Sequence, residues 1–217
     1  MIIAIVVAGF AKTYFFRPLF PGQEPLTSLV WAHGLLMTGW IALFVTQVIL
    51  VARGHIEWHR RLGQFGAVLL LVIAMVGIPT VLVAARLGGD HMPGPAQPAL
   101  ASVLGFLITF LGLAGTALLL RRRPDYHKRL MLVATLVAME AGTSRLPIQY
   151  LDSVFRIHAT NDVILLAIVA YDTLKHRRLH PAFAYGTLLV ITMQAATEWI
   201  AGTPTWLHIA QRIIGVI

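Results

Sequence analysis

Long runs of apolar residues, separated by short basic segments, follow one another along this sequence. About 20 predominantly apolar residues are enough for a helix to cross the hydrocarbon core of a bilayer. We predict seven such spans, at approximately residues 2–17, 28–52, 60–86, 99–120, 127–147, 159–175 and 182–202. Because a lipid-exposed backbone must satisfy its hydrogen bonds internally, the expected fold is all-α. We therefore expect a polytopic membrane helical bundle in which residues 1–217 form a single domain.

Composition supports a membrane protein in contact with the lipid bilayer and excludes several other classes. Hydrophobic residues make up 58% of the chain and charged residues only 12%, whereas soluble domains carry about 25% charged residues. Cysteine is absent, which excludes disulfides, thiolate metal sites and iron–sulfur clusters. The net charge of +8 lies mainly in short loops between spans, so nucleic acid is not an expected partner.

Basic residues are distributed unevenly between the two sides of the predicted bundle. The loops at 53–61, 121–129 and 175–180 lie on the same side and hold eleven of the 17 Lys and Arg residues. Short loops rich in Lys and Arg remain in the cytoplasm. We therefore expect a cytoplasmic N-terminus and a C-terminus on the opposite side.

The last segment, TPTWLHIAQRIIGVI at 203–217, differs from the predicted spans because it is amphipathic. Its apolar face consists of Trp206, Ile209, Ala210, Ile213 and Ile217. We expect a C-terminal amphipathic helix that lies on the outer membrane surface or packs against the bundle. A partner membrane subunit is an alternative occupant of the same face.

Ionisable side chains recur in the outer halves of four predicted spans. They are His33, Glu140, His158, Asp162 and Glu198. Such residues are costly in hydrocarbon and normally face the bundle interior, where they have partners. Imidazole and carboxylate together form the ligand set of zinc or iron, and also that of a proton relay. We predict that these side chains converge on one outer pocket; the alternative is that each only fixes the packing of neighbouring helices.

Two further histidines, His59 and His127, begin the third and fifth spans on the basic side. Transmembrane b-type cytochromes hold haem between histidines of two helices, so this pair is a candidate haem b site, with His33 and His158 as a candidate outer pair. Both inner histidines lie at the water boundary among arginines, where interface anchors are common.

Three segments carry a resemblance to a known group of proteins. They are AHGLLMTGWIALFVTQ (32–47), EWHRRLG (57–63) and RRRPDYHKRLMLVATL (121–136). This pattern resembles an uncharacterised family of bacterial multi-spanning membrane proteins, a domain of unknown function. The resemblance implies a bacterial inner membrane location, with the C-terminus then periplasmic, and a helical bundle. A looser likeness to two-haem transmembrane ascorbate and ferric reductases rests on the histidines of alternate spans.

Three functional hypotheses follow from the sequence. The first is an integral membrane protein whose outer pocket binds a metal ion or haem for redox or proton-linked chemistry. The second is an accessory or structural subunit of a larger membrane complex. The third is a small transporter that uses the same pocket as a proton-coupled site. Gly77-Ile78-Pro79 predicts a break in the third span, but the sequence has no matching segment in a second half, which transporters usually have. Common hydrolase and nucleotide motifs such as H-E-x-x-H, G-x-S-x-G and the phosphate-binding loop do not occur, so whether the chain is an enzyme stays open.

Overall fold

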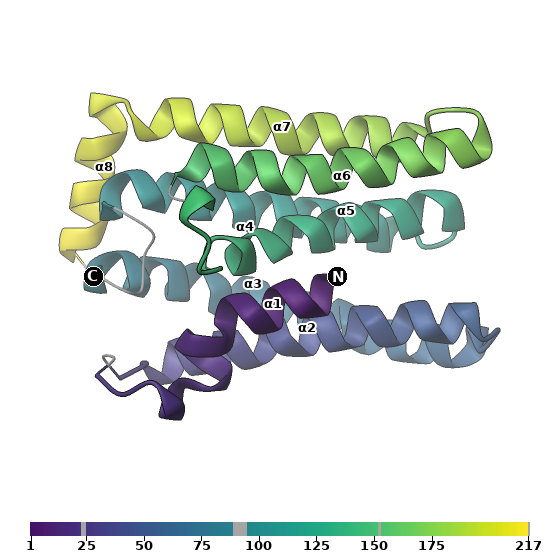
Figure 1. The fold of residues 1–217 in the computed structure, drawn as a ribbon, viewed down its shortest axis with the longest axis horizontal. Coiled ribbons are helices and arrows are strands. Elements are labelled where there is room, and N and C mark those ends of the chain that lie inside the picture. The colour runs from purple at the N-terminus through teal and green to yellow at the C-terminus, as the bar shows by residue number, and fades with distance from the viewer. Residues whose placement is uncertain (23–24, 89–94, 152, 217) are drawn as a thin grey trace.

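Six long helices run side by side along one axis, and a shorter helix crosses one end of the bundle (Figure 1). The computed structural model describes residues 1–22, 25–88, 95–151 and 153–216, which contain helices and turns but no strand. The α-helices are α1 (Ile2–Phe10), α2 (Ser28–Ala52), α3 (Ile56–Leu87), α4 (Ala96–Leu119), α5 (Pro124–Thr143), α6 (Val154–His176), α7 (Pro181–Ala201) and α8 (Pro204–Val216). The predicted all-helical bundle is therefore confirmed over the described ranges.

Four of these helices, α2, α3, α4 and α6, are long and apolar enough to cross a membrane. The first apolar helix is shorter, because α1 is continued only by a π-helical turn at Ala11–Phe15. These four helices support a membrane protein, and the large exposed apolar side chains on them are consistent with lipid contact. Examples are Phe65 and Met75 on α3, with exposed fractions of 70% and 75%.

Helix ends agree with the sequence where a local signal marks them. The bounds of α2 are the predicted ones, and its N-cap Thr27 accepts a hydrogen bond from the Val30 N–H. In contrast, α6 begins at Val154, earlier than predicted, because the Ser153 hydroxyl accepts from the Arg156 N–H and caps it. His158 consequently lies about one turn inside α6.

The predicted break at Gly77-Ile78-Pro79 is wrong. Helix α3 continues from Ile56 to Leu87 with Pro79 in its interior. Proline removes one backbone hydrogen bond, and neighbouring Ser or Thr hydroxyls often bind carbonyl groups exposed at such positions. Here the Thr80 hydroxyl donates to the Val76 carbonyl at 2.7 Å.

The two ends of the bundle differ in composition. The turns α2–α3, α4–α5 and α6–α7 lie together at one end, which we call the basic end because these turns carry most of the Lys and Arg residues (Figure 1). Helix α8 crosses the opposite end, which we call the α8 end. The N-terminus lies about halfway along the bundle, so α1 does not reach the basic end, and the predicted cytoplasmic N-terminus stays a prediction.

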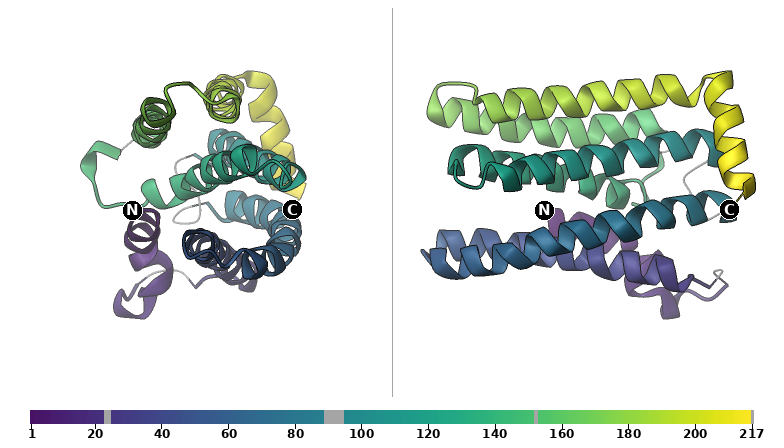
Figure 2. Two further views of the ribbon diagram at one scale, coloured as in Figure 1. Left: turned by 90° about the vertical axis from the view of Figure 1, so that its right-hand side faces the viewer. Right: turned by 180° about the vertical axis from the view of Figure 1, so that it is seen from behind.

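Helices α4 and α5 form the centre of the molecule, between α6 and α7 on one side and α1, α2 and α3 on the other (Figure 2). Small residues allow the closest approaches in this core. A Cβ atom added to Gly105 of α4 would lie 2.3 Å from Cγ2 of Thr197 on α7. One added to Gly9 of α1 would lie 2.0 Å from the carbonyl oxygen of Gly142 on α5.

Helix α8 packs against its own bundle, which is one of the two predicted arrangements. The Trp206 indole donates to the Gln97 carbonyl of α4 at 2.8 Å, and Ala210 is fully buried. Ile213 packs with Ala210 against α3 and α4. The apolar face of α8, for which a partner subunit was the alternative occupant, is therefore largely covered by this chain. Ile209 is exposed, and Ile217 lies outside the described residues.

Candidate functional site

Glu140 and His158 form a hydrogen-bonded pair near the α8 end of the bundle. The Nδ1 atom of His158 on α6 bonds to Oε1 of Glu140 on α5. Both side chains are buried, and Glu140 is only 2% exposed. Each residue lies about one helical turn from the end of its helix, which places the pair at a common depth.

A second carboxylate faces the other side of the same imidazole. Oε1 of Glu198 on α7 lies 3.8 Å from Nε2 of His158 and accepts a hydrogen bond from the Ser102 hydroxyl of α4 at 2.9 Å. Unlike Glu140, the Glu198 side chain is 43% exposed. His158 therefore stands between a buried and an exposed carboxylate, with one ring nitrogen towards each.

Further polar contacts connect α6 to its neighbours. The Gln194 amide of α7 donates to Oδ1 of Asp162 at 3.2 Å. At the preceding residue of α6, the Thr143 hydroxyl of α5 donates to Oδ1 of Asn161 at 3.1 Å. Asp162 thus lies on the side of α6 that faces α7, although neither of these bonds links it directly to His158.

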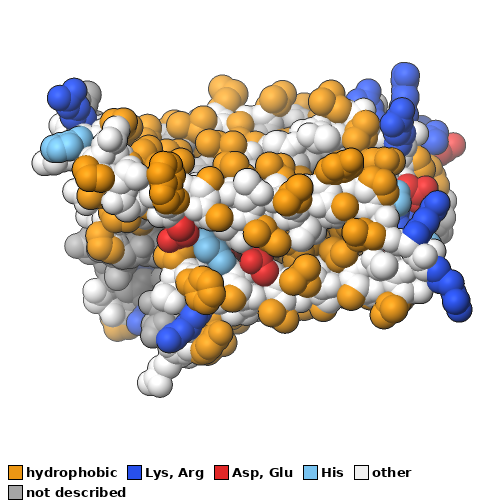
Figure 3. All heavy atoms as spheres, turned by 90° about the horizontal axis from the view of Figure 1, so that it is seen from above, with side chains coloured by type: hydrophobic (Ala, Val, Ile, Leu, Met, Phe, Trp, Pro, Cys, Tyr) orange, Lys and Arg blue, Asp and Glu red, His pale blue; other side chains and the backbone are white. Residues whose placement is uncertain are grey.

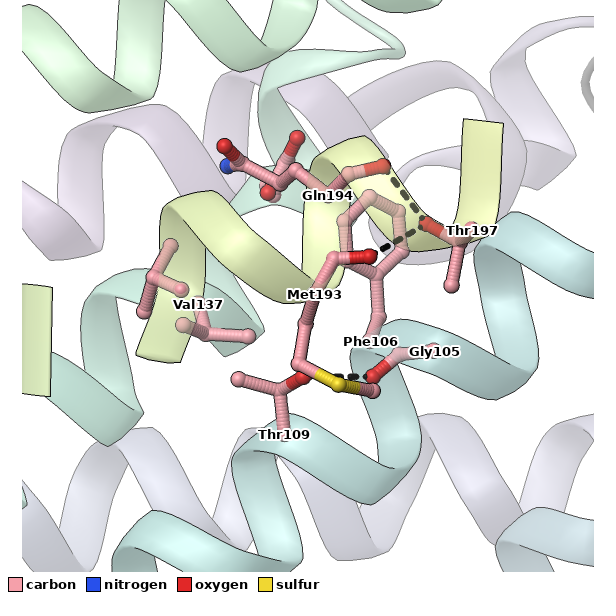
Figure 4. Close-up of a pocket in the computed structure, with 9 residues that line it drawn as sticks. Gly105, Phe106, Thr109, Val137, Met193, Gln194 and Thr197 are labelled. Carbon is pink, nitrogen blue, oxygen red and sulfur yellow. Dashed lines mark hydrogen bonds between the residues drawn. The ribbon is translucent and has the colours of Figure 1, made fainter. Parts of the chain in front are cut away.

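Beside Glu140 lies a small cavity between α4, α5 and α7. Its volume is about 10 Å³, which is close to the minimum needed for one water molecule. Figure 4 shows Phe106, Thr109, Val137 and Met193 around it. The hydroxyls of Thr109 and Thr197 donate to backbone carbonyls of their own helices rather than into the cavity.

The network reaches the surface on the side formed by α6 and α7. Acidic and histidine side chains interrupt an otherwise largely apolar face there, away from the basic end (Figure 3). The partly exposed members are Asp162 and Glu198. Polar side chains therefore extend from the buried pair to this face of the molecule.

His33, the fifth residue of the predicted pocket, does not join this network. It lies on α2 against α3, where a Cβ added to Gly77 would be 3.9 Å from its Cε1 atom. Its Nδ1 atom is buried and has no hydrogen-bond partner among the described residues.

These side chains do not form a set of metal ligands in the part of the chain that the structure describes. No group of three or more His, Asp or Glu side chains over the described ranges has a geometry suited to a metal ion. Zinc and iron sites require three or more protein ligands around one point. The zinc or iron site that we predicted from His33, Glu140, His158, Asp162 and Glu198 therefore has no support in the geometry.

The inner histidines lie close together at the basic end. The rings of His59 and His127 have centroids 6.2 Å apart and meet edge to face. His127 Nδ1 bonds to the Ala117 carbonyl at 2.8 Å, whereas Nδ1 of His59 is buried without a partner in the described structure. The two rings are therefore neighbours, and haem binding by this pair stays a prediction.

Sequence reasoning missed one strong interaction. Arg129, which we treated as a loop cation, is only 4% exposed and forms two hydrogen bonds with the Asp172 carboxylate of α6, at 2.8 and 2.9 Å. An acidic residue near the end of an otherwise apolar helix was the available signal, because such a residue requires a nearby cation.

Comparison with protein-family models, with curated proteins and with solved structures gives no match.

Proposed function

We propose that this chain is an integral membrane protein whose activity is linked to proton uptake and release by Glu140 and His158. The observation that carries the proposal is the position of His158 between two carboxylates of opposite exposure. Glu140 is 2% exposed, whereas the side chain of Glu198 is 43% exposed. In this scheme Glu198 exchanges protons with the exterior, and His158 passes them to Glu140.

The chemistry of imidazole supports this assignment. A histidine ring can accept a proton at one nitrogen and release another from the second nitrogen. Nδ1 of His158 already bonds to Glu140. The gap of 3.8 Å between Nε2 and Glu198 Oε1 exceeds a hydrogen bond by less than 1 Å. A change of rotamer at Glu198 would close it, which provides a simple means to connect and disconnect the two carboxylates.

The size of the cavity favours protons over larger ligands. A volume of about 10 Å³ beside Glu140 admits one water molecule at most. An organic substrate or a haem group requires far more space, since ligand pockets usually exceed about 300 Å³. Among the three functional hypotheses, proton-linked chemistry is therefore the one that the dimensions of the site support.

The proposal includes an orientation. We infer that α5, α7 and the first apolar helix also lie in the bilayer, which would give seven membrane segments. The basic end then faces the bacterial cytoplasm, by the rule that Lys- and Arg-rich loops stay inside. Glu198 would exchange protons with the periplasmic side, near which the Glu140–His158 pair lies.

Infrared difference spectroscopy on protein in liposomes tests the proposal. A step in the external pH should change the carbonyl band of a protonated carboxyl group. We expect this band to vanish in Glu140→Gln and to respond more slowly in Glu198→Gln. Asp162→Asn is the matched control, because Asp162 is also an acid of the α6–α7 face but is hydrogen-bonded to Gln194.

Two outcomes would contradict the proposal. One is a pH-dependent band that is identical in Glu140→Gln and the wild-type protein, because the proton would then reside elsewhere. The other is the same response rate in Glu198→Gln as in Asp162→Asn. In that case Glu140 and His158 would form only a packing contact, and protons would not reach them through Glu198.

A further inference from the structure

A larger cavity lies at the basic end of the bundle, where α5, α6 and α7 meet. Its volume is about 140 Å³, several times the roughly 30 Å³ that one water molecule occupies in the liquid. The residues that line it are Asp125, Arg129, His176, Arg178 and His180. Basic, acidic and histidine side chains gather at this end of the molecule (Figure 3). The cavity is therefore polar and large enough for a small charged group.

Most charges around this cavity are paired, and one is not. Arg129 is bound by the Asp172 carboxylate at 2.8 and 2.9 Å. The ammonium group of Lys128 lies 3.1 Å from the Asp125 carboxylate. Arg178 is exposed and has no ion-pair or hydrogen-bond partner over the part of the chain that the structure describes. The cavity therefore keeps one uncompensated positive charge.

His180 adds a hydrogen-bond donor to this cavity. Its Nδ1 atom accepts the Ala182 N–H at 3.1 Å and caps α7. Burial, and then the nearby charge of Arg129, lower the pKa of His180, so the imidazole is neutral near pH 7. A neutral imidazole that accepts at Nδ1 carries its proton on Nε2. The Nε2–H group is then available to a ligand.

From this geometry we infer that the cavity binds a phosphate diester group, held by the Arg178 guanidinium and the Nε2–H group of His180. A phosphate diester carries one negative charge, which matches the single unpaired cation. Guanidinium groups bind phosphate oxygens through charge-assisted and often bidentate hydrogen bonds. This inference concerns the end of the bundle opposite the Glu140–His158 pair and does not depend on the proposed proton function.

The surroundings of the cavity point to a phospholipid as the source of the phosphate group. Large apolar side chains of α6, α7 and the turn between them are exposed near this end: Leu174 by 79%, Leu179 by 51% and Tyr185 by 72%. An acyl chain attached to the bound phosphate would lie along such side chains. Basic pockets at the cytoplasmic ends of membrane helices bind anionic lipid headgroups. Free phosphate could make the same hydrogen bonds with Arg178 and His180, but it has no acyl chain to contact the exposed apolar side chains.

Native mass spectrometry of the detergent-solubilised protein tests the inference. The probes are phosphatidylglycerol, which has a phosphate diester, and monogalactosyl diacylglycerol, which has none. We expect phosphatidylglycerol to be retained preferentially and its affinity to fall about tenfold in Arg178→Gln, the usual effect of removing a hydrogen bond to a charged group. His180→Asn keeps an N-cap acceptor for α7 and removes the Nε2 donor, so it should also weaken binding.

Arg122→Gln is the matched control, because Arg122 is also an exposed arginine, lies in the adjacent α4–α5 turn and does not line the cavity. The inference is overturned if Arg122→Gln weakens lipid binding as much as Arg178→Gln, or if the galactolipid is retained equally well. A second experiment uses inorganic phosphate alone as the probe. If it stabilises the wild-type protein but not Arg178→Gln against thermal unfolding, while no lipid is retained, the same site takes free phosphate rather than a headgroup.

Discussion

His158 connects the folding of the bundle to its proposed chemistry, because its removal leaves Glu140 buried and without its partner. Truncation of one member of a buried, hydrogen-bonded pair costs about 3–5 kcal/mol in proteins. We expect His158→Ala to lower the free energy of unfolding by about 3 kcal/mol. The double variant with Glu140→Gln should recover part of this loss, because the buried group is then neutral.

The measurement is a set of unfolding titrations in mixed detergent micelles for the wild-type protein, the two single variants and the double variant. Asp162→Asn serves as the control, because Asp162 is only partly buried and makes a single hydrogen bond with Gln194. Equal stability of His158→Ala and the wild-type protein would show that the pair contributes nothing to the fold.

His59 and His127 allow a second prediction at the scale of single residues. Both side chains are half-buried at the basic end, and buried apolar side chains such as Leu113 and Val133 also hold α4 and α5 together beside the His127–Ala117 hydrogen bond. We expect His59→Ala and His127→Ala each to cost about 1 kcal/mol or less, as for one ordinary hydrogen bond. Unfolding titrations and the visible absorption spectrum check this. Loss of a haem spectrum in His127→Ala would mean that the functional site lies at the basic end.

At the scale of helices, α4 and α7 approach closely because Gly105 has no side chain. A Cβ atom there would lie 2.3 Å from Cγ2 of Thr197, so the Thr197 side chain or one of the two helices has to shift. We expect Gly105→Ala to destabilise the bundle by about 1–3 kcal/mol, the typical cost of overpacking. Adding Thr197→Ser should restore most of the stability, because serine lacks the clashing methyl group and keeps the hydroxyl.

Gly115→Ala is the control for this prediction, because Gly115 lies on the same helix and a Cβ atom there would meet nothing within 4 Å. Thermal unfolding of the purified variants provides the measurement. If Thr197→Ser does not improve the stability of Gly105→Ala, the close approach of α4 and α7 is not the cause of the loss.

Helix α6 is held to the bundle by polar as well as apolar side chains. Its buried residues are only Ile157, His158, Asn161 and Leu165. The pair of His158 and Glu140 attaches it near the α8 end, and the Asp172–Arg129 ion pair attaches it at the basic end. Because one pair attaches α6 near each of its ends, a change in the charge of either pair can change how tightly it packs.

At the scale of the whole molecule, the basic end determines the expected orientation in the membrane. Reporter fusions after residues 55, 124 and 178 should behave as cytoplasmic, and a fusion after residue 217 as periplasmic, because Lys- and Arg-rich loops are retained inside. An alkaline phosphatase and green fluorescent protein pair at each position provides complementary readouts. A periplasmic result at residue 124 would reverse the orientation and place Glu198 on the cytoplasmic side.

Local sequence signals determined the helices of this protein. The length and apolar character of residues 28–52 predicted both ends of α2, because helix formation in lipid depends on local composition and on caps such as Thr27. The sequence also predicted that Glu140 has a partner inside the bundle, because an unpaired charge is costly to bury in hydrocarbon. Where a cap was overlooked, as at Ser153, the predicted start of α6 was displaced from the observed one.

Only the tertiary structure decided which partners meet. From the sequence, His33 was as plausible a partner for Glu140 as His158, yet His33 packs against α3. Apolar helices in lipid have similar affinity for one another on most faces, so their order around the bundle follows from close-packed details such as Gly105 against Thr197. That order, which local composition does not encode, brings α6 beside α5 and places His158 between Glu140 and Glu198.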